Sequence, residues 1–209
     1  MTGSNLWIVE ELWNLGAIEF GDYTLGRTAV HSPIYVNVRR LISNPLVLDR
    51  CAALMNLELE ALLAMRNPHV QPFGLVAGVP FGGLHLGTAY SLRTTMPMIY
   101  IHPPRPDRES MIEGIYRPGQ SCLIIDDLVT GGGSILQTAQ LLRDSGMFVH
   151  DAVALVDRLE GGRRALKDGG INLTSIVTLE QISNYLYSNE KIDRQTHARV
   201  MAYIAAARG

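Results

Sequence analysis

The stretch over residues 121–146 constrains the fold more than any other part of the chain. It reads SCLIIDDLVTGGGSILQTAQLLRDSG, and its apolar run at residues 123–125 is typical of a strand buried on both faces of a parallel sheet. Asp126 and Asp127 follow where such a strand would end. Apolar residues then recur at helical spacing, at Ile135, Leu136, Ala139, Leu141 and Leu142. The stretch therefore predicts a buried strand, a glycine-rich turn and an amphipathic helix.

The predicted turn is a run of small and hydroxyl-bearing residues: Thr130, Gly131, Gly132, Gly133 and Ser134. Glycines let the backbone come close to an anion, and N–H groups at the start of a helix form a phosphate site. The two neighbouring carboxylates are suited to accept hydrogen bonds from vicinal hydroxyls. A phosphorylated sugar would satisfy both parts of the motif. The alternative is a structural turn with solvated aspartates.

Two familiar nucleotide-binding motifs do not fit this loop. No lysine precedes Ser134, so the loop is not a Walker A motif. The three glycines are followed by Ser-Ile-Leu, which does not match the G-x-G-x-x-G pattern of dinucleotide-binding proteins.

The composition is that of an ordinary globular protein. With 209 residues, of which 47% are hydrophobic and 18% charged, the chain can form one sizeable core, and we expect a single domain over residues 1–209. A formal net charge of −2 gives no overall attraction to nucleic acid or to a membrane surface. No signal sequence opens the chain and no apolar run approaches membrane-spanning length, so we expect a cytoplasmic protein.

Cysteine and lysine usage narrow the chemistry further. Cys51 and Cys122 lie in apolar surroundings, which predicts buried free thiols rather than a disulfide framework. Lys167 and Lys191 are the only lysines among 18 basic residues, so arginine supplies every other fixed cation.

Strand and helix patterns alternate along most of the chain. Strands are predicted over residues 18–25, 32–38, 74–78, 98–101, 121–125, 149–156 and 171–178, with an extended return near 111–116. Helices are predicted over residues 5–15, from Asn44–Pro45 to about 65, over 82–92, after the glycine loop, over 162–167 and in two terminal segments. This alternation predicts an α/β fold with a mainly parallel, Rossmann-like sheet flanked by helices. Ligands of such sheets bind beyond the carboxyl ends of the strands.

Two further loops are expected at that edge of the sheet. The first contains Val79, Pro80, Phe81, Gly82 and Gly83, and predicts either a second anion cradle or a structural proline turn. The second places Arg158 directly after a strand. Its guanidinium could bind a carboxylate or ring carbonyl of a substrate bidentately. The alternative is an ion pair with Asp157 or Glu160.

The segment HPPRPDRES, at residues 102–110, is rich in proline and charge. Arg105 and Arg108 could close over an anionic substrate, as lid loops do. The alternative is a solvated surface loop.

Five segments between about residues 15 and 190 resemble orotate phosphoribosyltransferases: HSPIYVNVRRLISNP, AGVPFGGLHLGTAYSL, MPMIYI, MIEGIYRPGQSCLIIDDLVTGGGSI and VDRLEGGRRALKDGGINLTSIVTLEQISNYL. The acids and glycine loop resemble the phosphoribosyl pyrophosphate (PRPP) motif of many phosphoribosyltransferases. The SPIY and DRLEGGR stretches are more specific to the orotate branch. The resemblance implies a phosphoribosyltransferase fold with a small N-terminal hood, formed by about residues 1–40 and parts of the C-terminal region.

The resemblance also implies an activity and its ligands. Phosphoribosyl would pass from PRPP to orotate, giving orotidine 5′-monophosphate and pyrophosphate in pyrimidine nucleotide biosynthesis. Mg²⁺ is the implied cofactor, although the sequence does not identify its ligands, and a homodimer is the implied assembly. PRPP and orotate are the implied partners, with no nucleic acid and no membrane.

Residue roles follow from the same resemblance. Asp126 and Asp127 would bind the ribose hydroxyls, residues 130–134 the 5′-phosphate and residues 79–83 the pyrophosphate. The base site would be formed by Arg158, Ile34, Tyr35, Thr130 and Arg27. The family's basic catalytic loop corresponds to residues 102–110, where lysines are absent. His102, Arg105 and Arg108 are the candidates for its catalytic positive charge.

Two other functions remain open from the residues alone. One is a phosphoribosyltransferase that acts on another base, since residues near Gly26 and His102 differ from the family pattern. The other is a non-catalytic PRPP or nucleotide sensor on the same fold.

Overall fold

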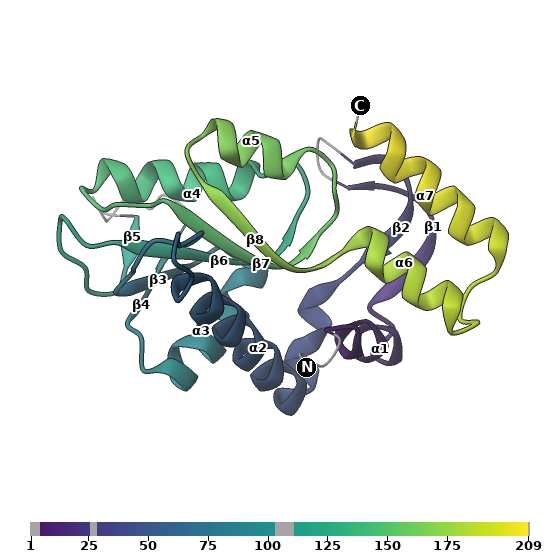
Figure 1. Ribbon diagram of the computed structural model, residues 1–209, viewed down its shortest axis with the longest axis horizontal. Helices are drawn as coiled ribbons and strands as arrows, with labels where there is room; N and C mark the ends of the chain where they lie inside the picture. Colours follow the sequence, from purple (N-terminus) through teal and green to yellow (C-terminus); the bar gives the residue numbers. More distant parts are fainter. Residues whose placement is uncertain (1–4, 26–28, 103–110, 209) are drawn as a thin grey trace.

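A six-stranded sheet forms the centre of the protein (Figure 1). The computed structural model describes residues 5–25, 29–102 and 111–208. The strands lie in the order β5-β4-β3-β6-β7-β8, and all neighbours pair in parallel except β4 and β5. Their bounds are β3 Leu75–Gly78, β4 Met98–Ile101, β5 Ile112–Glu113, β6 Cys122–Val129, β7 Asp151–Asp157 and β8 Asn172–Thr178.

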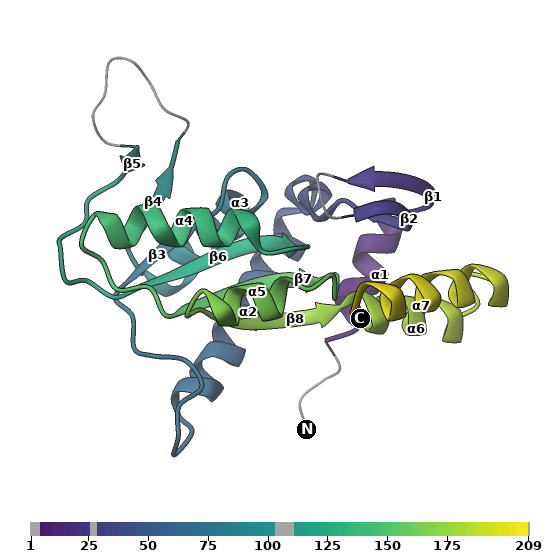
Figure 2. The same cartoon turned by 90° about the horizontal axis from the view of Figure 1, so that it is seen from above.

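Helices cover both faces of this sheet (Figures 1 and 2). One face packs against α2 (Pro45–Leu63) and α3 (Gly82–Thr94), and the other against α4 (Gly133–Asp144) and α5 (Gly162–Asp168). Side chains of a strand alternate between the two faces. In β6, Leu123 and Ile125 therefore join the first core, whereas Cys122 and Ile124 join the second. The expected α/β architecture, a mainly parallel sheet between two helical layers, is confirmed.

A second, two-stranded sheet stands apart from the central one (Figure 2). It pairs β1 (Ile18–Leu25) with β2 (Ala29–Val36) in antiparallel register, with Ile18 opposite Val36. The remaining elements are α1 (Trp7–Asn14), the 3₁₀ helix η1 (Val38–Ser43), α6 (Leu179–Ser188) and α7 (Arg194–Arg208). The terminal helix α7 contacts both α6 and β2. The C-terminal helix α7 thus packs against the N-terminal hairpin formed by β1 and β2.

Local sequence signals explain where several helices begin. The Asn44 side chain accepts a hydrogen bond from Val47 N at 3.4 Å, and Pro45 occupies the first turn of α2, as predicted. Thr178 and Gln181 form a capping box at the start of α6. These caps satisfy N–H groups that a helix start leaves without intrahelical partners.

The predicted end of the central strand, at Ile125, was wrong. We expected the strand to stop at Ile125, with both acids in the following loop, but β6 continues to Val129. The neighbouring β7 is the reason, because it pairs Asp126 with Ala154 and Leu128 with Val156. The two acids therefore lie on a hydrogen-bonded strand, which fixes their backbone more firmly than a loop would.

The two cysteines are buried and free, as predicted. Burial raises the pKa of both thiols, Cys51 and Cys122, to about 12. Both are therefore protonated at neutral pH and unsuited to nucleophilic chemistry. Among the described helices, none has the length and apolarity needed to cross a membrane.

Candidate active site

The candidate site lies where the chain direction in the sheet changes. The strands β3 and β6 are neighbours, yet the chain passes from β3 to β4 on one side and from β6 to β7 on the other. The loops that follow β3 and β6 start side by side at the carboxyl edge and then lead to helices on opposite faces of the sheet, α3 and α4. Such a switch point is the usual ligand site of an open α/β sheet.

A cavity of about 250 Å³ occupies this point. Segments that are far apart in the sequence line it, which confirms the predicted convergence of the loops after three strands. The lining residues are Tyr35, Val36, Asn37, Val38, Arg39, Val79, Pro80, Phe81, Gly82, Asp126, Asp127, Leu128, Thr130, Ser134 and Arg158.

The two acids of the cavity interact with one another. Asp126 is 6% exposed, and its Oδ1 accepts a hydrogen bond from Asp127 N at 2.9 Å. Burial and the charge of Asp127 raise the pKa of Asp126 well above its usual range. Burial also raises the pKa of Asp127, although the side-chain hydrogen bond with Asp126 and the charge of Arg39 act in the opposite direction. Asp127 is therefore the acid that ionises more readily.

The loop after β3 comes into close contact with these acids. A Cβ atom on Gly82 would lie 2.1 Å from Cγ of Asp127, and one on Gly83 would lie 2.4 Å from the carbonyl oxygen of Ile125. Only glycine fits at either position. The two glycines thus bring the start of α3 against the acid-bearing half of β6. Gly83 does not line the cavity, and its role is this close packing.

Replacing Gly82 by Ala is expected to displace the Asp127 carboxylate. Overpacking of this kind costs about 1–3 kcal/mol of folding free energy, and that loss lowers Tm by roughly 2–4 °C per kcal/mol in a chain of this size. Thermal unfolding followed by circular dichroism measures the effect. Gly74→Ala is the matched control, because a Cβ there meets nothing within 4 Å. Equal Tm values for the two variants would contradict the close packing.

The glycine loop after β6 surrounds a smaller cavity of about 30 Å³. Asp126, Thr130, Gly132, Gly133 and Ser134 line it together with adjoining residues. Gly132 has φ +79°, a left-handed conformation that favours glycine, and α4 begins at the next residue. The N-terminus of this 12-residue helix therefore faces the cavity with backbone N–H groups and its positive dipole end. Gly131 does not line either cavity.

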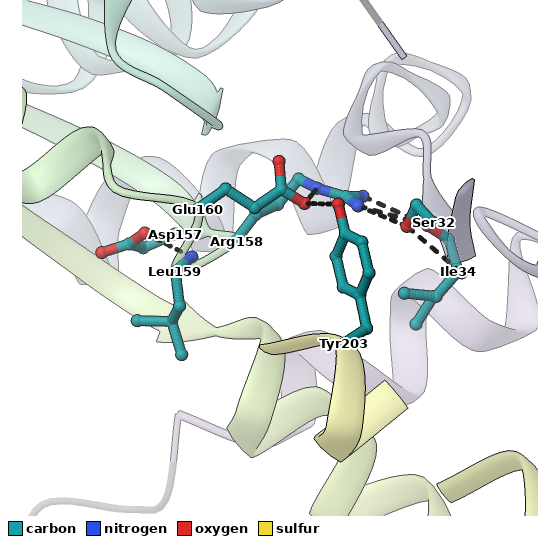
Figure 3. Close-up of polar contacts among 7 residues, drawn as sticks. All are labelled: Ser32, Ile34, Asp157, Arg158, Leu159, Glu160 and Tyr203. Atoms are coloured by element: carbon teal, nitrogen blue, oxygen red, sulfur yellow. Dashed lines mark hydrogen bonds and ion pairs between the residues drawn. The ribbon is translucent and has the colours of Figure 1, made fainter. Parts of the chain in front are cut away.

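Arg158 reaches the main cavity, but the surrounding protein already holds its guanidinium (Figure 3). Nε donates to Glu160 Oε1 at 2.8 Å, Nη2 donates to Ser32 Oγ at 2.8 Å, and both Nη atoms donate to the Ile34 carbonyl at 3.3 Å. Of the five N–H donors of an arginine, one on Nη1 remains within the described part of the chain. The expected bidentate fork is therefore wrong, and the alternative ion pair with Glu160 is confirmed.

Other predicted residues lie in different places. Ile34 is fully buried and does not line the cavity, whereas Tyr35 does, because successive side chains of β2 point to opposite faces. His102 lies in an adjoining cavity of about 470 Å³, which shares Val79, Pro80, Phe81 and Ser134 with the first. Its Nε2 is 3.7 Å from Glu113 Oε1. Arg27, Arg105 and Arg108 lie outside the described residues.

The sequence analysis missed Arg39. This exposed arginine lines the cavity, and its guanidinium donates to Asn37 Oδ1 at 3.3 Å and Tyr35 Oη at 3.5 Å. Its charge also acts on Asp127. One signal could have identified it, since an arginine directly follows a predicted strand in a chain that uses almost no lysine.

Two glycine-containing loops and a pair of acids at a parallel-sheet switch point are the arrangement of a phosphoribosyltransferase-type site. No protein-family model matches the sequence. Orotate phosphoribosyltransferase of Chlamydia caviae is 36% identical over 184 residues, which cover 86% of this chain and 84% of that protein. This relative shows that the chain belongs to the orotate phosphoribosyltransferase family.

Longer proteins also match this chain, one in sequence and one in structure. Uridine 5′-monophosphate synthase of Bos taurus is 35% identical over 199 residues, 94% of this chain, but the chain spans only 40% of that protein. The structure of UMP synthase from Leishmania donovani has a TM-score of 0.85 and 30% identity, and the match covers 98% of this chain and 43% of that one. The expected phosphoribosyltransferase fold is confirmed.

Proposed function

We propose that the protein transfers phosphoribosyl from PRPP to orotate, giving orotidine 5′-monophosphate and pyrophosphate in pyrimidine nucleotide biosynthesis. One observation carries this proposal: a single cavity is lined by both anion loops, by Asp126 and Asp127, and by Tyr35 of the hairpin. PRPP carries phosphate at one end, diphosphate at the other and hydroxyls between them. The cavity thus offers a partner for each of these three kinds of group.

Each group of the cavity has a role in this proposal. Thr130, Ser134 and the N–H groups at the start of α4 bind the 5′-phosphate. Asp126 and Asp127 accept hydrogen bonds from the ribose 2′ and 3′ hydroxyls. The loop at residues 79–83 binds pyrophosphate through its backbone.

The base site lies between Tyr35 and Arg158 in our proposal. The Tyr35 ring offers a face on which a pyrimidine can stack, and the remaining Nη1–H of Arg158 can donate to a single acceptor on the base. With one donor left, Arg158 can orient the base but cannot form a bidentate ion pair with its carboxylate. Two other residues were predicted for the base site. Arg27 lies outside the described residues, and Ile34 does not line the cavity.

Arg39 supplies most of the positive charge at the site. Arg158 is already neutralised by Glu160 at 2.8 Å, so it adds little field to the cavity. Arg39 is exposed, and within the described chain its guanidinium donates two long hydrogen bonds, both to neutral groups. We propose that it moves onto the diphosphate of PRPP, since residues 79–82 of the loop after β3 line the same cavity. His102, Arg105 and Arg108 remain candidates for further positive charge at this end.

The chemistry follows from these placements. The bond from the anomeric carbon to pyrophosphate breaks, a bond from that carbon to a ring nitrogen of orotate forms, and positive charge develops on the sugar between the two. The site contributes by holding both reactants in line and by placing Asp126 and Asp127 beside the cationic sugar. Arg39 stabilises the negative charge that develops on the leaving group.

Mg²⁺ fits the donors of this site. The described residues contain no group of three or more His, Cys, Asp and Glu side chains that could hold a metal on their own. Mg²⁺ binds instead through one or two carboxylates together with substrate phosphates, and Asp126 and Asp127 are the carboxylates present. When bound, the ion would neutralise charge on the diphosphate oxygens. It would also favour the ionised state of both acids.

Assembly and location are further parts of the proposal. Ile42 and Leu92 are 48% and 78% exposed and line a cavity between η1, α2 and α3. This apolar surface supports a homodimer, which sedimentation equilibrium would test. We further propose one domain with β1, β2 and α7 as its hood, and a cytoplasmic enzyme without nucleic-acid or membrane partners.

A base-specificity assay tests the function. Pyrophosphate release from PRPP is measured with Mg²⁺ and with orotate, uracil, adenine or hypoxanthine as the acceptor. We expect release with orotate that exceeds release with the other bases by at least about tenfold, the effect of one well-placed interaction. Preferential release with another base would show a different substrate. PRPP binding without release would show a sensor.

A further inference from the structure

A continuous set of contacts, partly buried at Tyr203 and buried from there on, joins the terminal helix to the hairpin (Figure 3). Tyr203 of α7 donates from its hydroxyl to Glu160 Oε1 at 2.9 Å, and the same oxygen accepts from Arg158 Nε at 2.8 Å. Arg158 in turn donates to Ser32 Oγ and to the carbonyl of Ile34 on β2. Three segments separated by more than 40 residues thus meet around one carboxylate.

Burial makes the geometry of these contacts restrictive. The side chains of Arg158 and Glu160 are 1% and 2% exposed, and Ser32 is fully buried. Charged groups removed from water need well-aligned partners, because no solvent can replace a lost hydrogen bond. Glu160 Oε2 has no hydrogen-bond partner within the described chain, so Oε1 carries the contacts of the carboxylate. The Tyr203 hydroxyl therefore helps to fix the orientation in which Glu160 holds Arg158.

The position of these contacts connects them to the cavity. Arg158 lines the cavity, and the carbonyl that it holds belongs to Ile34, the residue before Tyr35. A shift of the guanidinium would move its free Nη1–H and also the strand that carries the Tyr35 ring. Within the described chain, the Tyr203 hydroxyl hydrogen-bonds to Glu160 rather than to the loops after β3 and β6.

We propose that Tyr203 is a positioning residue of the base site. Acting through Glu160, it sets the orientation of Arg158 and hence the spacing between Arg158 and Tyr35. This inference rests on the proposed function, because it takes those two residues as the base site. The terminal helix thereby gains a role in recognition of the base, separate from the binding of PRPP.

The variant Tyr203→Phe tests the proposal with little risk to folding. It removes one hydroxyl and keeps the ring, while Val200 and Ile204, which are 0% and 1% exposed, still anchor α7. We expect KM for orotate to rise about threefold to tenfold, the effect of one lost hydrogen bond. We expect KM for PRPP and the PRPP dissociation constant to change by less than about twofold, because the PRPP loops lie on other strands.

Tyr185→Phe is the matched control. Its hydroxyl donates to Glu10 Oε2 at 3.1 Å, so it is also a tyrosine–glutamate pair, but it joins α6 to α1 away from the cavity. Both variants are expected to lose similar thermal stability. Only Tyr203→Phe is expected to change KM for orotate.

The outcomes separate this inference from the proposed function. A selective rise in KM for orotate in Tyr203→Phe supports the positioning role. Equal orotate KM values in Tyr203→Phe and Tyr185→Phe, or an equal rise in both substrate KM values, would overturn it while leaving the function intact. A folded wild-type protein that turns over no orotate would instead overturn the function and, with it, the base site.

Discussion

Replacing Asp127 by Asn is expected to lower kcat/KM for PRPP by about tenfold to 100-fold. The carboxylate lies in the cavity, is the more readily ionised acid of the pair and faces the sugar in the proposed complex. The amide keeps the shape but loses the charge and one acceptor. Each charged hydrogen bond contributes about 1.5–3 kcal/mol, or about tenfold to 100-fold in rate. Initial-rate kinetics with both substrates measure the loss.

The control for this variant is Asp144→Asn. Asp144 is an acid on α4 that accepts a hydrogen bond from Gln140 Nε2 at 2.7 Å and does not line the cavity. Its replacement makes the same chemical change at the surface and is expected to leave kcat/KM within about twofold. Comparable losses in the two variants would show that Asp127 has no special role.

The second acid of the pair, Asp126, affects the stability of the fold. Burial and the charge of Asp127 raise its pKa in the folded state. A carboxyl group of this kind stabilises the fold fully below its unfolded pKa of about 3.9, and that contribution is lost as pH rises through the folded pKa. At neutral pH the acid therefore costs stability.

Asp126→Asn is expected to raise Tm of the ligand-free protein while it lowers turnover. The gain should be at least about 2 °C, which corresponds to about 1 kcal/mol in a chain of this size. It should shrink as pH falls toward 4, because the wild-type acid is then protonated. Calorimetry at several pH values measures this trend. A gain that grows at low pH would contradict the raised pKa.

Replacing Arg39 by Ala is expected to lower kcat/KM for PRPP by about tenfold to 100-fold, the effect of one charged hydrogen bond. Arg39 and Arg158 are the cations among the described residues that line the cavity. Arg158 forms an ion pair with Glu160, whereas no ion pair with a carboxylate neutralises Arg39 within the described chain. Lysine at position 39 should restore part of the rate, because the role requires a positive charge more than a bidentate fork. KM for orotate should change much less.

Arg40→Ala is the control for this effect. Arg40 is the next residue, yet its Nη1 donates to the Leu15 carbonyl at 3.1 Å and its Nη2 to Glu19 at 3.4 Å, outside the cavity. Its replacement removes an equal charge from the same segment. A similar loss in both variants would indicate a general effect of net charge. A loss confined to KM for orotate in Arg39→Ala would place Arg39 at the base instead.

The sequence predicted the elements that depend on local signals. Asn44 and Pro45 indicated the start of α2, and the apolar run in β6 indicated a strand buried on both faces. The convergence of the two glycine-containing loops also followed, because the strand order of a parallel sheet brings their ends to one edge. These inferences required only neighbours in the sequence and one general rule of topology.

The contacts of individual site residues could not be predicted in this way. Arg158 is held by Ser32 and Ile34, which are 126 and 124 residues away in the sequence. No local pattern shows that these groups take up the guanidinium. The length of β6 likewise depends on its pairing with β7. Arg39 was missed for the same reason, since its distance from Asp127 depends on the packing of η1 against the sheet.

The most direct test of the central claim is the identity of the products. The purified protein is incubated with PRPP, orotate and Mg²⁺, and nucleotides and pyrophosphate are separated and quantified over time. We predict equimolar formation of orotidine 5′-monophosphate and pyrophosphate, with about tenfold to 100-fold slower formation by Asp127→Asn. Absence of orotidine 5′-monophosphate, from a folded protein that binds PRPP, would contradict the account.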